Sequence, residues 1–492
     1  MSEISTFDID VDWDADGSFI DPNSDITADV LYLPVEIVRG RDFSRPLSPP
    51  QAGEARFSVA NDDNKYHPEN SGSVLAGNLV PGRDLRIRTV YSTVTYDLFR
   101  GNLDELNIDP NPGQRRANVV ALDGLAAETE LSTAVTQNAA TGTLIGLILD
   151  EIGWSATRRN LDTGILTVPL WWEEGTSAFD ALVKLVQSEG PGAALFVDGS
   201  GDVVFHDRHH RLLTAASNTS QTTFRDTGTE PVYSIPQTYQ PPWAGIVNDI
   251  TISVTRRSQG ALQTVWTYSG GTIGLGASES RILRVKADNP CTSLTDPVGG
   301  TDYTLLSGSV TSATLDRSSG QTATLTITAG AGGASLNGLI VRGRPWSADD
   351  AVEVSSSDAT SQTAYGVRSP ASFDTTWVDD ENEAQSLADA IIAAYKDPVA
   401  RVSITVSNAN STRYTQVLSR EVNDRITIVD ADSGMNKEFY IDRIIHAISD
   451  AGTVHKAIFD CTEAVEPLVS SSQVFILNSA TQGKLNTNKL GW

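Results

Sequence analysis

Apolar and polar residues alternate along most of this chain in short runs. A period of two places successive side chains on opposite faces of an extended backbone, so each run predicts a β-strand with one wet face. Gly, Asn and Pro turns separate the runs at close spacing. The pattern therefore predicts a mainly-β protein, and clear examples are residues 85–90, 324–328, 402–406 and 425–429.

Three segments depart from this alternation and repeat their apolar residues at helical spacing. The first ends at Gly153, a typical stop. The second begins with a capping box at Ser177 and ends at Gly190. In the third, acidic residues from Asp380 onward favour a helix N-terminus, and Pro398 forbids continuation. Helices are therefore predicted over residues 144–152, 177–190 and 380–396.

The length of the chain and its turn-forming segments indicate several units, because 492 residues exceed what one core usually holds. We expect an acidic N-terminal arm at 1–24, an all-β unit at 25–125, an α+β domain with two helices and a hairpin at 126–235, a strand at 236–255, a Ser/Thr/Gly-rich inserted β-sandwich at 256–364, one helix with several strands at 365–465, and a polar C-terminal tail at 466–492.

The net charge of the chain limits the kinds of partner that we expect it to bind. With 36 Lys and Arg against 62 Asp and Glu, the formal charge is −26, and so acidic a chain is a poor sequence-independent binder of nucleic acid. The acidic N-terminus lacks the hydrophobic stretch of a secretion signal. Without an apolar run of about 18 residues, we expect no stable membrane insertion.

An Asp-rich motif near the N-terminus is the first candidate for chemistry. Asp12, Asp14, Asp16 and Gly17 match the start of a calcium-binding loop. The twelfth position is Asn23, where such a loop needs a bidentate Glu, and no amphipathic helix flanks the motif. An acidic turn in a solvated arm is therefore favoured over a calcium site.

A histidine-rich segment is the second candidate. His206 and His210 have the spacing that would place two metal ligands on one helix face. The segment follows a strand, however, and Arg208 and Arg211 would repel a cation. A polar loop leaving a strand is favoured, and we expect no metal and no cofactor.

Candidate nucleophiles and acid pairs give little support for catalysis. Cys291 and Cys461 lack a partner motif and are expected to be buried and reduced. The run Trp171-Trp172-Glu173-Glu174 combines aromatic and carboxylate groups, as sugar-cleaving sites do. Because it immediately precedes a capped helix, a structural role is favoured, and no catalytic residue is assigned.

Several stretches, taken in order, resemble phage tail hub proteins, which are the baseplate hubs of contractile tails and the tail-tip hubs of long flexible ones. The segment from Val35 to Asp104 is similar to their first tube-like domain, in residues 40–42, 53–70, 79–87 and 97–103. Residues 171–206 look like a recurrent helix-and-hairpin unit of the family. The second barrel is matched by residues 244–252, as its opening strand, and by residues 380–396, 401–406, 423–429 and 439–446.

This resemblance implies two tail-tube-like β-barrels, one at 25–125 and one built from 236–255 and 365–465. In the family, three chains provide six barrels, so a homotrimer seats on a hexameric tube. The chain would then be a structural virion protein of the tail, assembled in the host cytoplasm. Its partners would be the tail tube or distal tail ring and the tip, fibre or spike proteins. DNA would pass through its channel without sequence-specific binding.

Two other functions remain open from the residues alone. One is a tail-associated, cell-wall-degrading glycoside hydrolase, but the chain has no lysozyme-like or peptidase-like sequence, so we expect no enzymatic activity. The other is a carbohydrate-binding adhesin, which would need a secretion signal. The insert at 256–364 is expected to face outward and to bind either a neighbouring tail protein or a host polysaccharide.

Overall fold

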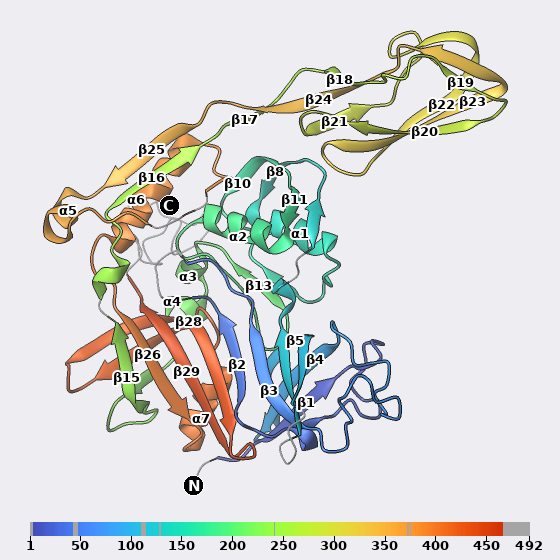
Figure 1. Cartoon of the computed structure of the whole chain (residues 1–492). Helices are drawn as coiled ribbons and strands as arrows, with labels where there is room; N and C mark the ends of the chain where they lie inside the picture. The colour runs from blue at the N-terminus through green and yellow to red at the C-terminus, as the bar shows by residue number, and fades with distance from the viewer. Residues whose placement is uncertain are drawn as a thin grey trace.

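The computed structural model describes residues 3–42, 48–109, 115–126, 129–240, 242–370, 373 and 375–465. The predicted tail at 466–492 lies outside these residues. Strands dominate, so the predicted mainly-β class is confirmed. In Figure 1 a large sheet forms the base, most of the helices lie above it, and a long β arm extends from the top.

The base is a twelve-stranded sheet with the order β1-β4-β5-β6-β3-β2-β28-β29-β26-β15, to which β27 and β14 are added beside β28. Its N-terminal half contains β1 (Thr6–Val11), β2 (Val35–Gly40), β3 (Glu54–Ala60), β4 (Asp84–Tyr91), β5 (Val94–Asp109) and β6 (Arg116–Leu122). Its C-terminal half contains β14 (Thr223–Arg225), β15 (Ser234–Gln240), β26 (Arg401–Ser407), β27 (Arg425–Asp430), β28 (Met435–Ser449) and β29 (Val454–Glu463).

Each half of the sheet curves around its own hydrophobic core. The N-terminal core gathers inward-facing residues of β1 to β6, among them Ile9, Ile87 and Phe99. The C-terminal core gathers Phe224, Ile404 and Phe459 with Tyr414 of α7 (Ser411–Ser419). Alternating burial along the strands, as in β4, matches the predicted period of two.

The N-terminal segment differs from the predicted arm. Residues 6–11 form β1, which pairs antiparallel with β4 from Thr6 opposite Val90 to Val11 opposite Leu85. Phe7, Ile9 and Val11 are buried in the N-terminal core, so the prediction of a separate arm at 1–24 is wrong for this stretch.

A second difference concerns the strand predicted to open the second barrel. Residues 249–254 form β16 (Asp249–Val254), which pairs with β25 (Val352–Ser357) and not with the central sheet. The strand beside β26 is instead β15. Helix α6 (Glu381–Tyr395) packs on β16 and β25 and joins the core of the helical unit, so its predicted place in the second barrel is also wrong.

The helical unit above the sheet contains the other two predicted helices, α1 (Thr141–Glu151) and α2 (Ala178–Glu189), and all three predicted helices are confirmed. The Ser177 hydroxyl accepts a hydrogen bond from the Asp180 amide, as a capping residue does. Small sheets surround these helices: β7 (Glu130–Ser132) with β11 (Glu174–Ser177), β8 (Thr136–Ala140) with β10 (Thr167–Trp171), and β9 (Arg159–Leu161) with β13 (Val203–His206) and β12 (Ala194–Val197).

Several short helices were not predicted. They are α3 (His210–Leu213), α4 (Ala215–Asn218), α5 (Ala359–Tyr365) and α7, with 3-10 turns at Thr27–Asp29, Gly124–Ala126 and Pro242–Gly245. No helix in the described part of the chain is long and apolar enough to cross a membrane.

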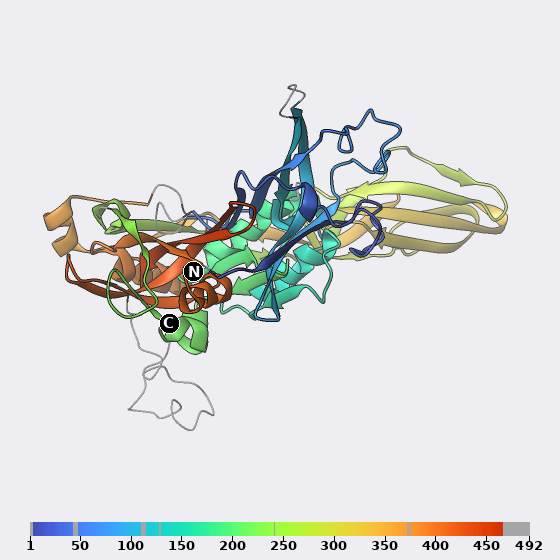
Figure 2. The same ribbon diagram turned by 90° about the horizontal axis from the view of Figure 1, so that it is seen from below.

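The arm, defined here as residues 257–348, extends far from the body in both views (Figures 1 and 2). One of its sheets contains β17 (Arg257–Gln259), β18 (Gln263–Thr267), β21 (Cys291–Thr295) and β24 (Ile340–Ala348). The other contains β19 (Ile273–Leu275), β20 (Ser280–Lys286), β22 (Thr304–Arg317) and β23 (Thr322–Asn337). The two sheets enclose a core that includes Ile273, Leu325 and Val341.

Contacts at its base brace the arm against the helical unit. Trp346 of β24 packs edge-to-face on Trp172, with ring centroids 5.9 Å apart. The Gly320 amide donates to the carbonyl oxygen of Thr133 at 2.7 Å. The Arg257 amide donates to Asp379, and its guanidinium lies 4.9 Å from the ring of Trp377. These contacts fix the direction in which the arm projects.

Candidate functional site

The two halves of the central sheet meet where β2 pairs antiparallel with β28. The pairing runs without interruption from Val35 opposite Ile448 to Gly40 opposite Arg443. Strand β28 is long enough to pair at its other end with β27, from Met435 to Tyr440. The backbone ladder therefore joins the two cores into one continuous structure, and this junction is the feature that sets their relative position.

Gly40 ends β2 at the closest approach of the two halves. Its φ of +114° lies in a region that side-chain-bearing residues rarely adopt. A Cβ atom at this position would overlap the carbonyl oxygen of Asp442 and lie 2.8 Å from the Cα of Arg443. Both the conformation and the space therefore require glycine.

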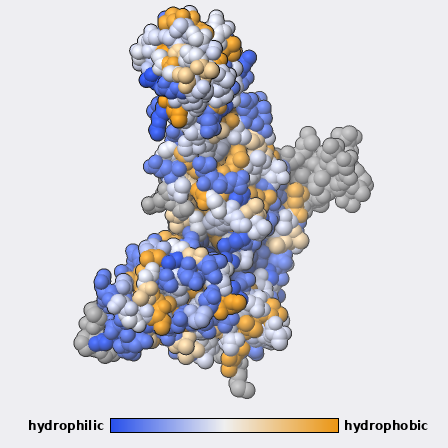
Figure 3. Space-filling model, turned by 90° about the vertical axis from the view of Figure 1, so that its right-hand side faces the viewer, coloured by the Kyte–Doolittle hydropathy of each residue, from blue (hydrophilic) through white to orange (hydrophobic). Residues whose placement is uncertain are grey.

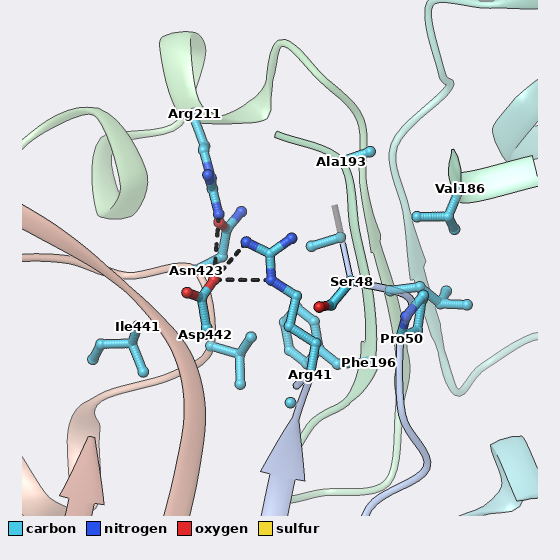
Figure 4. A pocket seen from close by; sticks show the side chains of 14 residues that line it. Arg41, Ser48, Pro50, Val186, Ala193, Phe196, Arg211, Asn423, Ile441 and Asp442 are labelled. Carbon is cyan, nitrogen blue, oxygen red and sulfur yellow. Dashed lines mark hydrogen bonds and ion pairs between the residues drawn. The ribbon is translucent and has the colours of Figure 1, made fainter. Parts of the chain in front are cut away.

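A cluster of charged side chains lies directly beyond Gly40 (Figure 4). The Arg41 guanidinium donates from Nε and Nη2 to Asp442, whose side chain is 1% exposed, at 2.9 and 2.5 Å. Arg211 is the second residue of α3. It donates from Nε to the Asn423 side-chain oxygen at 2.6 Å, and its Nη2 lies 4.0 Å from Asp442. The Thr462 hydroxyl donates to the second oxygen of Asp442. We call these residues the junction cluster.

The electrostatics of the junction cluster depend on one carboxylate. Burial lowers the pKa of Arg211, and the neighbouring Arg41 charge lowers it further. Burial also opposes the charge on Arg41, but the Asp442 carboxylate outweighs it and raises the pKa of Arg41. The guanidinium of Arg211 stacks on Tyr440, 4.0 Å from the ring centre. A cavity of about 20 Å³ between these groups has room for about one water.

One further ion pair crosses the junction, and a buried carboxylate of the N-terminal half lies near it. Arg39 of β2 donates from one nitrogen to both oxygens of Glu421, at 2.8 and 2.9 Å. The buried Asp123 carboxylate accepts hydrogen bonds from the amides of Gly53 and Leu125. Burial raises the pKa of Asp123 to about 7.

A histidine pair is buried in the C-terminal half of the sheet, close to the junction. His446 of β28 and His455 of β29 are 2% and 0% exposed, and their ring nitrogens lie 3.0 Å apart. Burial lowers the pKa of His455 to about 3 and that of His446 well below its usual value. Both rings are therefore neutral at physiological pH, and they serve to connect β28 with β29.

The histidine-rich segment singled out in the sequence lies beside the junction cluster. His206 stacks on His210 with ring centroids 3.4 Å apart. The Nδ1 atom of His206 lies 3.0 Å from the Asn423 amide nitrogen, and that of His210 lies 2.8 Å from Asp162. Both histidines therefore have structural partners. In the described part of the chain, the two histidines do not form a possible metal site with a third His, Cys or acidic residue.

The Asp-rich motif does bring its carboxylates together. Oxygen atoms of Asp12, Asp14 and Asp16 lie within 4.8 Å of one another. Asp12 is buried and accepts from the amides of Asp16 and Gly17, so it is used in closing the loop. The carbonyl of Asn23 accepts from the Trp13 indole. These contacts match the acidic turn favoured from the sequence, and exposed acidic groups of this kind are common without an ion.

The two carboxylates at Glu173 and Glu174 have different environments. Glu173 is 5% exposed, accepts from the Thr176 hydroxyl at 2.7 Å and lies 3.5 Å from Lys184. Glu174 is exposed in β11. Trp171 is buried against Trp377, and Trp172 contacts the arm. Glu173 and both tryptophans therefore have structural contacts, whereas the Glu174 side chain faces solvent.

The sequence reasoning did not single out the junction cluster as a unit. Arg41, Asn423 and Asp442 lie in three separate stretches of the family resemblance, at 40–42, 423–429 and 439–446. A signal was available, because each is a polar residue at the end or in the middle of an apolar strand pattern. This local pattern does not indicate, however, that the three residues contact one another.

Comparisons with known proteins bear on the fold. No family model and no curated protein matches the sequence. Among solved structures, the tail protein from Neisseria meningitidis MC58 is 11% identical and has a TM-score of 0.50, with 94% of this chain and 97% of that chain covered.

Two further structures are more distant. The 43 kDa tail protein of prophage MuSo2 from Shewanella oneidensis is 12% identical, with a TM-score of 0.46 and coverage of 94% and 98%. The E. coli c3393 protein, a component of the type VI secretion system, is 9% identical, with a TM-score of 0.37 and coverage of 89% and 76%. The likeness to the Neisseria protein extends over nearly the full length of both chains, and this chain therefore has the tail-protein fold that its sequence resemblance predicted.

Proposed function

We propose that this chain is a structural hub of a phage tail, which acts as a homotrimer between the hexameric tail tube and the tip. Its two sheet halves would each imitate one tube subunit, so three chains would present six such units. Closed symmetry would make each interface specific. The chain would be part of the virion, would have the tail tube or distal ring and tip proteins as neighbours, and would form part of the DNA-ejection channel.

The observation that carries this proposal is the continuous twelve-stranded sheet. Six strands surround the N-terminal core and six surround the C-terminal core, and the β2–β28 ladder joins them. Two linked β units in one rigid chain are what a trimer needs in order to match a six-membered ring. The tail-protein fold supports the same assignment.

The charge of the chain supports a role for the channel wall. A conduit should not hold its cargo, and carboxylates facing the bore would repel phosphates, whereas a basic lining would bind them. The formal charge of −26 means that acidic residues outnumber basic ones, so carboxylates are available to line such a wall. We therefore propose an acidic channel surface, and a map of the assembled bore that proved neutral or basic would contradict it.

The decisive experiment is electron microscopy of tails that contain this chain with a peptide tag. We expect tag density with three-fold symmetry at the distal end of the tube. Absence of the tag from the tail, or a different rotational symmetry at its position, would overturn the proposal. Imaging the assembled particle is preferable to sizing the free chain, because only the particle shows where the chain lies relative to the tube and the tip.

The hydrolase alternative has weaker support. A catalytic carboxylate pair needs access to a glycosidic bond. Glu173, however, is buried and occupied by Thr176 and Lys184. A non-enzymatic role is therefore the better proposal.

A further inference from the structure

The arm differs in charge from the rest of the molecule. Residues 257–348 contain seven Lys and Arg against five Asp and Glu, a formal charge of +2, whereas the whole chain has −26 and the remainder therefore −28. Figure 3, which looks at the free end of the arm, shows a separate lobe of mostly intermediate hydropathy above a more hydrophilic body. The arm is therefore the one large part of the described chain that another copy's acidic body does not repel, and exposed cations on it can pair with carboxylates there.

The positive charge of the arm is concentrated on β20. This strand pairs with β23 on one side and is an edge of its sheet in the described structure. Arg281, Arg284 and Lys286 are exposed, and none of them has an ion pair with any residue that the structure describes. Most arginines of the body differ, since they are paired with a carboxylate, as Arg41 and Arg86 are.

The register of β20 defines an outward-facing row of side chains. Ile282, Arg284 and Lys286 lie opposite Thr326, Thr324 and Thr322 of β23, on the face away from the arm core. Ile282 is 68% exposed. A basic edge by itself would be explained as protection against unwanted strand pairing. An exposed isoleucine in the same row as the cations is not, because it adds apolar surface to the edge.

The chain carries a surface with the opposite properties. The loop after β1, residues 14–21, which we call the acidic loop, contains Asp14, Asp16 and Asp21, and none of these has an ion pair among the described residues. Ile20 in the same loop is 93% exposed. The loop therefore combines three uncompensated acids with one exposed isoleucine, which complements three uncompensated cations and Ile282.

The two surfaces cannot meet within one chain as it is folded. Figure 1 shows the arm at the top of the molecule and β1 at its base. The braced base of the arm, with Trp346 on Trp172, prevents it from folding back freely. A contact between them therefore needs a second copy.

We propose that β20 of one copy docks on the acidic loop of a neighbouring copy. The inference rests on the proposed homo-oligomer and specifies one of its contacts. Because the two surfaces are different, the contact is heterologous. Repeated from copy to copy, it forms a closed ring when a whole number of equal rotations completes one turn. The ion pairs provide orientation and the isoleucines provide the apolar centre.

Cysteine cross-linking between two variants of the full chain tests the contact directly. Arg284→Cys and Asp16→Cys are prepared separately, mixed and oxidised, and the native Cys291 and Cys461 are buried and do not interfere. We expect a disulfide-linked dimer in the mixture, about tenfold more than from Arg344→Cys with Asp16→Cys, because docking raises the effective concentration. Arg344 is an exposed cation on the opposite sheet of the arm. Equal yields from the two mixtures would overturn the proposal.

A charge swap provides the second test. Arg281→Glu with Arg284→Glu and Lys286→Glu should abolish self-association in sedimentation, as should Asp14→Lys with Asp16→Lys and Asp21→Lys. Combining both sets should restore it, and Arg344→Glu should leave it unchanged. If the variant with the first set of substitutions still forms a trimer, this contact is refuted, while the proposed hub function is not affected. If the first set instead removes adsorption to host cells, while the cross-link is absent, the strand binds a cell-surface anion and the proposal is wrong.

Discussion

The backbone amide of Arg41 donates to the carbonyl oxygen of Asp442 at 2.9 Å, and the side chains of the same two residues form an ion pair. The residues are 401 positions apart in the sequence. Main-chain and side-chain contacts thus act together at the point where the N-terminal and C-terminal halves of the sheet join. Asp442 is the central acid of a cluster that also includes Arg211, so its charge balances more than one cation.

Removing the Asp442 carboxylate should destabilise the protein strongly. In Asp442→Ala, Arg41 and Arg211 would remain mostly buried without their shared acid, and breaking a buried pair from one side costs about 3–5 kcal/mol. Denaturant unfolding monitored by tryptophan fluorescence measures this loss. Asp432→Ala, in the exposed turn before β28, is the matched control and should change the free energy of unfolding by less than about 0.5 kcal/mol. Equal effects would show that the junction cluster contributes nothing special.

Substitution of Gly40 separates backbone conformation from close approach. Gly40→Ala combines a positive φ with overlap on Asp442 and should cost about 2–4 kcal/mol. Gly434→Ala has a similar requirement, with φ of +72°, but open space around the new Cβ, and should cost about 1 kcal/mol. Thermal and denaturant unfolding of both variants provide the comparison. A Gly40 variant no less stable than the Gly434 variant would mean that β2 and β28 can move apart at little cost.

The sequence predicted the class of fold and three of the helices, because period and capping are local properties. The N-terminal strand was missed although its pattern was visible: Phe7, Ile9 and Val11 alternate with acids, as an edge strand with a wet face should. The density of acid suggested a solvated arm. In the structure those acids face arginines, and Asp10 pairs with Arg86 at 2.9 Å.

Pairing between distant segments could not be predicted from one sequence. The strand at 249–254 reads equally well as a barrel strand or as a stalk of the insert, and its partner, β25, lies about a hundred residues further on. The junction cluster has the same difficulty, since Arg41, Arg211 and Asp442 come from three separate parts of the chain. Each local pattern is satisfied by many pairings, and only the complete packing selects one.

Glu173 should behave as a structural residue. Glu173→Gln keeps the shape but removes the charge that faces Lys184 and weakens the bond from Thr176, so a loss of about 1–3 kcal/mol is expected. Glu174→Gln, at an exposed neighbour, should be almost neutral. Chemical unfolding of both variants checks this. Peptidoglycan hydrolysis by the wild type that disappears in either variant would support the enzymatic alternative instead.

The buried histidine pair should make stability depend on acid. Because burial holds the pKa of His455 near 3, below its unfolded value of about 6.5, the unfolded chain binds protons first as the pH falls. The contribution of the neutral pair is therefore complete above about pH 6.5 and is lost progressively between about pH 6.5 and 3. Each histidine should contribute a slope of up to about 1.4 kcal/mol per pH unit in this window.

The comparison that isolates this effect is the pH slope of His455→Gln against that of the wild type. The variant should lose stability at pH 8, because Tyr414 and His446 lose their partner, yet its stability should fall less steeply than that of the wild type below pH 6.5. Asp123 acts in the opposite sense, since its raised pKa favours the folded state as the pH falls below about 7, so absolute slopes mix both groups and the difference between variants is the useful quantity. His67→Gln, in a surface loop, controls for the loss of a histidine. Parallel curves for the wild type and His455→Gln would mean that the pair is already protonated or solvated in the folded protein.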